Sequence, residues 1–476
     1  MATPDAPSTN IPLTLWLTDR SRYSTGTGRC GRQRYLTNHF GPTGYGIVRK
    51  ADSLPLATGS YAHKVCETLW KYLQQHDQLP PPEIIRAAIE EANGAYLTRI
   101  EARGYRGLLQ SERSDYVVAE QQALIAGLVW AFSKVILPWF HAEYRVLQCE
   151  LESIYILDCT CGLGSQELDP YAHEARDCHG VGQQLKQDVI AERRQGGGLA
   201  YLEVKTTGWA GDTWASQWET RPQLAIGTFG IPERYSKEVT ELYVVGLYKG
   251  SRKTKGEGED QRVEQDSPFC YGYRKAGNPP LATDDWKPAY EWLDPVTGET
   301  KYARRPYAKS PVWLLPESDW PDWQYAQAAG WDPVEWWATQ FLPESVLKKS
   351  VFLVGPLNRQ DAQIESLKRQ IVGEERKWQD LLWKLYEAQH DRGLQWADPE
   401  FQALLDHLVP ASWDCQRYGS KHGCEFIPLC FKQSGWEDPV GTDHFVPRRP
   451  HHEPELQQAI SRGLLPEQAE EGDEEE

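Results

Sequence analysis

The sequence has one methionine, at position 1, in 476 residues, and it lacks several features that define protein classes. No stretch approaches the ~20 apolar residues needed to cross a bilayer, so no membrane partner is expected. The first residues lack the basic and apolar regions of a signal peptide, so a cytoplasmic location is expected. A Walker A pattern is absent, which excludes a chain that is itself a helicase.

Basic residues are also in deficit, with 51 Lys and Arg against 68 Asp and Glu and a formal charge of -17. This balance argues at first against a nucleic-acid partner, because phosphate neutralisation requires Lys and Arg. Part of the acidity is local, however. Residues 467–476 carry seven carboxylates, so residues 446–476 are expected to form an acidic, disordered tail.

Cysteine and tryptophan are well represented, with 10 and 20 residues. Because cytosolic thiols stay reduced, the cysteines are expected to be packing residues or metal ligands. The tryptophans are interpreted mainly as large core residues, although those that follow the strand at 199–206 would also be able to stack on unpaired bases: Trp209, Trp214 and Trp218.

Apolar spacing predicts an α/β fold. Helices are expected over 61–76, 82–103, 117–141 and 364–390, and strands over 146–157, 184–192, 199–206 and 241–248. The chain is divided accordingly into a loose N-terminus (1–25) and a core with an N-terminal helical part (26–250). An irregular Trp-rich insertion (251–345), a helical C-terminal region with a cysteine cluster (346–445) and the tail (446–476) follow.

The most informative pattern is a hairpin whose two strands both carry acidic residues. Because strand side chains alternate between faces, Glu203 and Lys205 share one face. A turn centred between positions 195 and 196 places Asp188 opposite Glu203, with Cβ atoms about 4.5–5.5 Å apart. Two carboxylates at that distance repel each other unless a cation or a proton lies between them.

A Mg²⁺ or Mn²⁺ ion bound by Asp188 and Glu203 would account for this pair and would serve phosphodiester hydrolysis. Such an ion lowers the pKa of a bound water and stabilises charge in the transition state. Lys205 would hold the attacking water or the developing oxyanion. The alternative is an ordinary solvated hairpin face with loosely paired charges, which is the more common case for an isolated pattern of this kind.

Other motifs accompany the hairpin in order along the chain: Gly59-x3-His63-x3-Glu67, Lys205-Thr206-Thr207 and Pro222-Gln223-Leu224. Together they resemble the RecB-like and phage-type nucleases of the PD-(D/E)XK superfamily over residues 25–250. The resemblance implies a restriction-endonuclease-like mixed β-sheet flanked by helices, with helical additions. It also implies catalytic roles for Asp188, Glu203 and Lys205.

By the same resemblance, His63 would join Asp188 and Glu203 at the metal, and Gln223 would contact the substrate or the site. The sequence departs from the family pattern at two positions. Gln187 stands where the family has proline, and Gly227 stands where an aromatic residue is expected, which weakens the assignment of Gln223. Glu150 is a further candidate for orienting the metal, or a surface charge.

Three cysteines near the C-terminus, in the pattern Cys415-x8-Cys424-x5-Cys430, leave a tetrahedral metal one ligand short. Cys30 would supply the fourth. This division resembles the iron–sulfur staple of some RecB-like nucleases, and it implies a [4Fe–4S] cluster that joins the two ends of the chain. Structural Zn²⁺ is the alternative, with His422 able to replace one cysteine, and three unrelated buried thiols are a further one.

A second group, Cys159-x-Cys161 with Cys178 and His179, is also a metal candidate. Its spacing is atypical of zinc knuckles, which favours packing.

The predicted function is a metal-dependent DNA exonuclease of recombination, replication or repair in a bacterium or phage. Its partners would be DNA, single-stranded or with free ends, and a recombination or replication protein. Lys249, Arg252 and Lys253 are expected to contact phosphates. A CRISPR-type adaptation nuclease that trims DNA ends and a catalytically silent DNA-binding subunit are the alternatives.

Overall fold

A computed structural model describes most of the chain. The described residues are 16–28, 30–41, 43–106, 114–164, 178–255, 262–270, 286–293, 300–306, 332–412, 424–433, 435–441, 444–450, 452–461 and 463–465.

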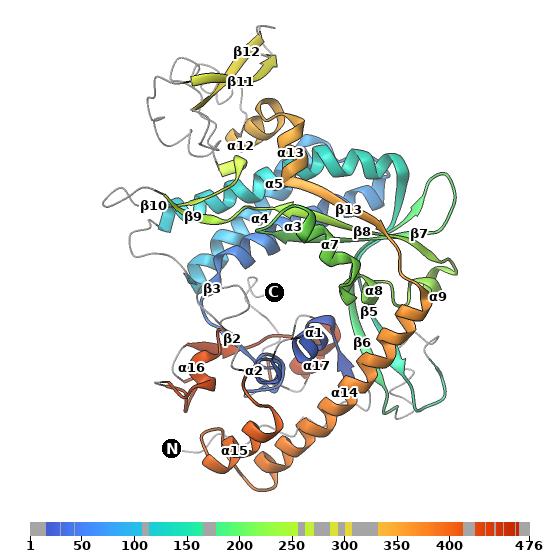
Figure 1. Cartoon of the computed structure of the whole chain (residues 1–476), viewed down its shortest axis with the longest axis vertical. Helices are drawn as coiled ribbons and strands as arrows, with labels where there is room; N and C mark the ends of the chain where they lie inside the picture. Colours follow the sequence, from blue (N-terminus) through green and yellow to red (C-terminus); the bar gives the residue numbers. More distant parts are fainter. Residues whose placement is uncertain are drawn as a thin grey trace.

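A six-stranded mixed sheet forms the centre of the fold (Figure 1). Its strands are β1 (Trp16–Thr18), β5 (Tyr144–Asp158), β6 (Val181–Arg193), β7 (Leu199–Thr207), β8 (Val239–Tyr248) and β13 (Val351–Leu357). The first three long strands, β5, β6 and β7, pair antiparallel, whereas β8 runs parallel to β7 and β13 closes the edge antiparallel to β8. The short strand β1 runs parallel to the start of β6.

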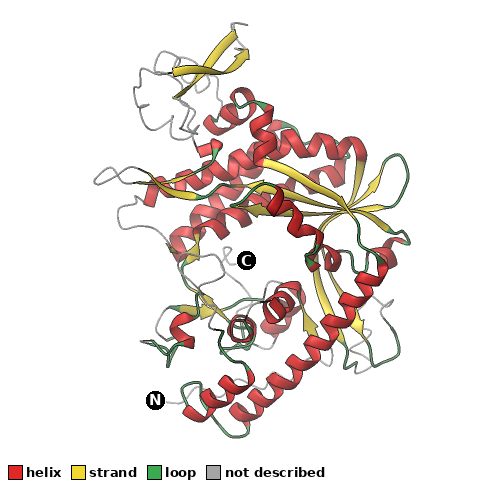
Figure 2. Ribbon diagram, viewed as in Figure 1, coloured by secondary structure: helices red, strands yellow, loops and turns green. Residues whose placement is uncertain are grey.

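Helices cover both faces of this sheet (Figure 2). Alternate residues of β7 divide between the two sides, since Leu202 and Val204 pack in one core and Leu199 and Tyr201 in another. The first face is covered by α3 (Leu54–His76), α4 (Pro82–Arg103), α5 (Ser114–Glu143), α12 (Pro333–Trp336), the π-helix η4 (Trp337–Phe341) and α13 (Glu344–Ser350). The second carries α7 (Asp212–Ser216), the 3-10 helix η1 (Gln217–Glu219), α8 (Pro222–Gly227), α9 (Ile231–Tyr235) and the first part of α14 (Asp361–His390).

The two ends of the chain fold together around a hydrophobic core of their own, separate from the cores on the two faces of the sheet. This part contains α1 (Arg20–Gly28), α2 (Gly31–Asn38), β2 (Ile47–Arg49), the far half of α14, α15 (Pro399–Leu408), α16 (Ile427–Cys430), β14 (Phe445–Pro447) and α17 (Glu453–Ser461). Strand β14 pairs with β2, and the buried Arg22 forms two hydrogen bonds of 2.6 Å with Glu455. Both contacts join N-terminal residues to C-terminal ones.

Besides the β2–β14 pair, three small ladders lie outside the main sheet in the described part of the chain. They are β3 (Asp52–Ser53) with β4 (Tyr105–Arg106), β9 (Arg252–Lys255) with β10 (Arg262–Gln265), and β11 (Trp286–Leu293) with β12 (Thr300–Pro306).

The predicted α/β class, with a mixed sheet flanked by helices, is confirmed, and each predicted helix and strand has a counterpart at its expected place. The differences involve long-range pairing. Residues 16–25, expected to be loose, form β1 and the start of α1 because β1 adds to the edge of β6. Residues 351–357, expected in a helical region, pair with β8, and α17 forms within the expected tail.

One helical stretch, Val117–Glu143 in α5, is long and apolar enough to cross a membrane, contrary to the expectation from the sequence. However, 72% of its most apolar window is buried inside the protein. This burial is typical of the core helix of a soluble protein.

Candidate active site

The central feature of the site is a fork in the sheet at Asp188. Strand β6 pairs with β1 through residues 181–183 and with β7 through residues 189–192. The pairing Val189↔Leu202 is the predicted register, and its continuation by one residue places Asp188 opposite Glu203. Here the Asp188 side chain takes part in the strand pairing, because its Oδ2 accepts a 2.7 Å hydrogen bond from the Val204 N–H.

Asp188 also belongs to a group of three metal-ligand side chains. His63 on α3, Glu150 on β5 and Asp188 each offer a ligand atom within 4.8 Å of the other two. The His63 Nε2 lies 3.2 Å from Asp188 Oδ2 and 4.0 Å from Glu150 Oε1. The sequence predicted His63, Asp188 and Glu203 as the metal ligands. Among the described residues, the group instead contains His63, Asp188 and Glu150, and Glu203 is not part of it.

Glu150 has an unusual backbone for a strand residue. It has a φ of 47°, in the left-handed region, between neighbours that pair with β6 as Cys149↔Val189 and Leu151↔Gln187. A non-glycine residue in that region costs about 1–3 kcal/mol and persists where the surrounding fold imposes it. Its carboxylate is buried beside Asp188, and its Oε2 accepts no hydrogen bond, although the Lys186 Nζ lies 3.4 Å away.

The electrostatics of the three groups are coupled. Burial alone would lower the pKa of His63, but the charge and hydrogen bond of Asp188 raise it to about 9. Burial opposes ionisation of Asp188, yet the neighbouring His63 holds its pKa well below the usual range. Burial and the Asp188 carboxylate together raise the pKa of Glu150 to about 7. A proton on His63 thus occupies the position that a metal ion would take.

These residues fit a divalent cation. Two adjacent carboxylates, one with a buried oxygen that accepts no hydrogen bond, favour a cation or a proton beside them. Carboxylates suit Mg²⁺ and Mn²⁺, and the imidazole favours Mn²⁺ of the two.

Glu203, fully buried on β7, accepts hydrogen bonds from three side chains and forms an ion pair with Lys205. Its Oε1 accepts hydrogen bonds from Arg20 Nη1 at 2.5 Å and Gln223 Nε2 at 2.8 Å, and lies 2.7 Å from Lys205 Nζ. The Tyr201 hydroxyl donates to the other oxygen. The structure thus brings together Glu203, Lys205 and Gln223, as the sequence predicted, and adds Arg20 and Tyr201.

Helix α3 reaches the site because residue 59 is glycine. A Cβ at Gly59 would lie 2.4 Å from Thr206 Oγ1, so this position allows the helix to contact the end of β7. One turn later on the same helix face, His63 meets Asp188. The spacing Gly59-x3-His63 therefore has a packing reason and a chemical one.

The predicted phosphate-binding residues face other partners. Lys249 is buried, burial lowers its pKa to about 8, and its Nζ donates to the Pro55 carbonyl at the start of α3. The Arg252 guanidinium lies 3.0 Å from the buried Glu120 carboxylate. Lys253 lies in β9, and its side chain is outside the described part. Partly exposed cations beside the acidic groups are instead Arg20, Lys186 and Lys205.

The predicted iron–sulfur ligands are described in part. Cys30 is the N-cap of α2, while Cys424 and Cys430 lie just before and within α16, half-buried against the core shared by the chain ends. Cys415 lies outside the described residues. The cluster therefore stays a prediction.

Two of the residues at the site were not found by the sequence patterns. Arg20 lies within the segment that was expected to be loose, and only the β1–β6 pairing brings it to Glu203. Tyr201 was hidden because a tyrosine in a strand is usually a packing residue. Its position two residues before Glu203, on the same face, is the signal that would have found it.

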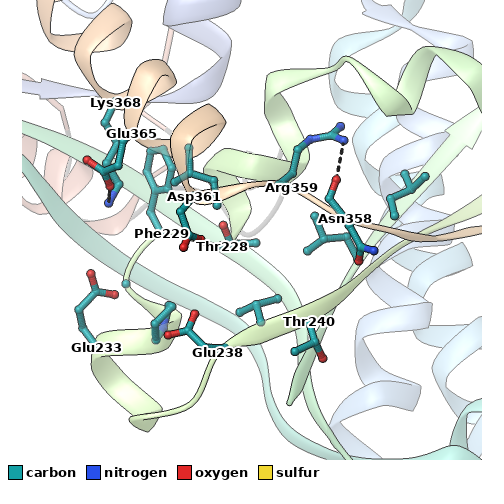
Figure 3. A pocket seen from close by; sticks show the side chains of 16 residues that line it. Thr228, Phe229, Glu233, Glu238, Thr240, Asn358, Arg359, Asp361, Glu365 and Lys368 are labelled. Carbon is teal, nitrogen blue, oxygen red and sulfur yellow. Dashed lines mark hydrogen bonds and ion pairs between the residues drawn. The ribbon is translucent and has the colours of Figure 1, made fainter. Parts of the chain in front are cut away.

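A cavity of about 430 Å³ lies elsewhere, between the starts of β8 and α14 (Figure 3). Its lining mixes acidic residues with Arg359 and Lys368 and contains none of the residues around Asp188 and Glu203. The described cavity and the catalytic candidates are therefore separate features.

A comparison with protein families finds no match, and a search of curated proteins finds no relative.

Proposed function

We propose that this protein is a metal-dependent deoxyribonuclease of the PD-(D/E)XK type. The observation that carries the proposal is the fork at Asp188, where a His63–Glu150–Asp188 group adjoins the Glu203–Lys205 strand. The mixed sheet with helices on both faces is compatible with the restriction-endonuclease-like core implied by the sequence.

Each part of this arrangement has a task in phosphodiester hydrolysis. When bound by His63, Glu150 and Asp188, a divalent cation supplies an activated water and charge stabilisation. Asp188 is kept in place by the Val204 N–H. Lys205 and Arg20 present positive charge toward the position of a scissile phosphate, where it stabilises developing negative charge.

Glu203 and its donors organise these cations. Without Glu203, Lys205 and Arg20 would lose the carboxylate that fixes them on one face. Gln223, at the start of α8, donates to the same Glu203 oxygen as Arg20, and its amide would also contact a bound DNA strand. This is the role that the family resemblance implies for it.

The test uses end-labelled single- and double-stranded DNA with Mg²⁺ or Mn²⁺. We expect cleavage that requires the metal and falls by at least about 100-fold in Asp188→Ala and Lys205→Ala, as for loss of a group that stabilises transition-state charge. Asp361→Asn, in the first turn of α14, is the control and should retain activity. A ladder that shortens progressively from the ends would identify an exonuclease.

Binding without cleavage by the wild type in either metal would contradict the nuclease proposal. That outcome would favour the silent DNA-binding subunit, for which Glu203 would be only a structural anchor of Arg20 and Lys205.

A further inference from the structure

Three cysteines that the proposed nuclease does not use meet at one end of the sheet. Cys159 and Cys161 directly follow β5, and Cys178 stands three residues before β6. The pairing Asp158↔Val181 brings these two strand ends together. The three thiols are therefore neighbours in space although up to 19 positions separate them along the chain.

The distances between the sulfurs suit a metal ion. The Sγ of Cys159 lies 3.3 Å from that of Cys161 and 3.9 Å from that of Cys178, and all three lie within 4.8 Å of one another. With Zn–S bonds of about 2.3 Å, tetrahedral geometry separates two thiolate sulfurs by about 3.7 Å. A disulfide needs about 2.05 Å, so these sulfurs are not bonded to each other.

The loop backbone also faces the sulfurs. Backbone N–H groups of Cys161 and Gly164 form hydrogen bonds to the Cys159 sulfur, and the Leu163 N–H forms one to that of Cys161. Two glycines with positive φ, Gly162 at 80° and Gly164 at 78°, allow the loop to wind in this way. These hydrogen bonds orient the Cys159 and Cys161 sulfurs relative to the loop.

The segment with Cys178 is tied to the same loop. The His179 N–H donates to Thr160 Oγ1 at 2.8 Å, and the next residue, Gly180, accepts a 3.0 Å hydrogen bond from Trp16 at the start of β1. Arg376 of α14 contacts both Asp158 and the His179 carbonyl. An ion here would fix the junction of β5, β6, β1 and α14.

We propose that Cys159, Cys161 and Cys178 supply three thiolate ligands of a zinc site. Its role is structural. The ion would hold the start of β6, the strand that carries Asp188, against the loop that follows β5. The sequence spacing favours packing for these cysteines. The structure favours a metal site instead, because it places their three sulfurs within 4.8 Å of one another.

The test measures zinc in the full-length chain, purified under reducing conditions without chelator from zinc-supplemented cultures. We expect Cys161→Ser and Cys178→Ser to lose one equivalent of zinc per chain relative to wild type. Cys270→Ser, which changes a buried thiol in a different hydrophobic cluster, is the matched control and should lose none. Cys430→Ser separates this site from the predicted cluster at the chain ends, because it should leave the zinc held by Cys159, Cys161 and Cys178 in place.

Cobalt titration of the wild type gives a second readout that does not depend on a variant folding. Metal-stripped protein should develop the intense thiolate-to-cobalt absorption of a tetrahedral sulfur site, and added Zn²⁺ should abolish it. The two carboxylates and one imidazole of the group at Asp188 cannot produce this absorption. Equal zinc in wild type and Cys161→Ser, or no thiolate–cobalt band in a wild-type chain whose thiols are reduced, would overturn the proposal.

Discussion

His63 Nε2 lies 3.2 Å from Asp188 Oδ2, which joins a helix on one face of the sheet to the strand at its fork. The contact explains why the pKa of His63 is raised against the effect of its burial. It also identifies the proton as a competitor for the proposed metal ion.

We therefore expect His63→Ala to weaken Mn²⁺ binding by about 10- to 100-fold, the range seen when metal-site partners are removed. Calorimetric titration of Mn²⁺ would measure this change. Exposed His76, at the end of the same helix, provides the control variant His76→Ala. Unchanged Mn²⁺ affinity in His63→Ala would exclude His63 as a ligand.

Gly59→Ala is expected to destabilise the fold by about 1–3 kcal/mol, because the new methyl group would meet Thr206 Oγ1. The same displacement of α3 should reduce DNA cleavage. Gly94→Ala in α4 is the matched control, since nothing lies within 4 Å of its added Cβ. It should stabilise the protein by up to about 1 kcal/mol through helix propensity. Urea unfolding of the two variants compares these opposite signs, and equal shifts would contradict the packing argument.

Lys249→Met is expected to leave DNA affinity and its salt dependence unchanged, contrary to the phosphate contact that the sequence suggested. The reason is that its Nζ is bonded to the Pro55 carbonyl inside the protein. Loss of this bond should cost about 1 kcal/mol of stability. Fluorescence anisotropy with labelled DNA over a salt series measures the affinity, with Lys205→Met as the variant that should weaken it. A reduced salt slope in Lys249→Met would restore the original prediction.

Much of the site was predictable where local pattern determines structure. The hairpin register followed from side-chain alternation and a glycine turn, and the helix with His63 followed from apolar spacing. Other parts depend on contacts distant in sequence. Arg20 reaches Glu203 only after β1 joins β6, and β13 joins β8 across more than 100 residues. Lys249 and Arg252 resemble a solvated charge run in the sequence, and only the fold turns them toward Pro55 and Glu120.

A pH effect is expected from His452, near the start of α17. Burial lowers its pKa to about 4, so the native protein keeps it neutral. The unfolded chain, with a histidine pKa of about 6.5, binds a proton first as the pH falls. Protonation of His452 therefore leaves the free energy of unfolding unchanged above pH of about 6.5. It lowers this free energy by about 3 kcal/mol in total as the pH drops to about 4.

His452→Asn should reduce that loss, whereas His390→Asn, at an exposed position, should not. Unfolding free energies measured at several pH values between about 4 and 7 would show the difference. Parallel pH profiles for wild type and His452→Asn would argue against a neutral buried His452.

Glu150 allows stability and metal binding to be separated. Its φ of 47° is strained for glutamate and easy for glycine, and its carboxylate is buried beside Asp188. We expect Glu150→Gly to raise the free energy of unfolding by about 1–2 kcal/mol and to weaken Mn²⁺ binding at the same time. Ser236→Gly is the matched control, because Ser236 has a φ of 51° at the exposed end of α9. It should gain stability without loss of Mn²⁺ affinity.

If Glu150→Gly gains stability and still binds Mn²⁺ as the wild type does, the strain at Glu150 serves something other than the metal site. A loss of both properties would instead mean that the carboxylate supports the fold through Lys186, whose Nζ lies 3.4 Å away.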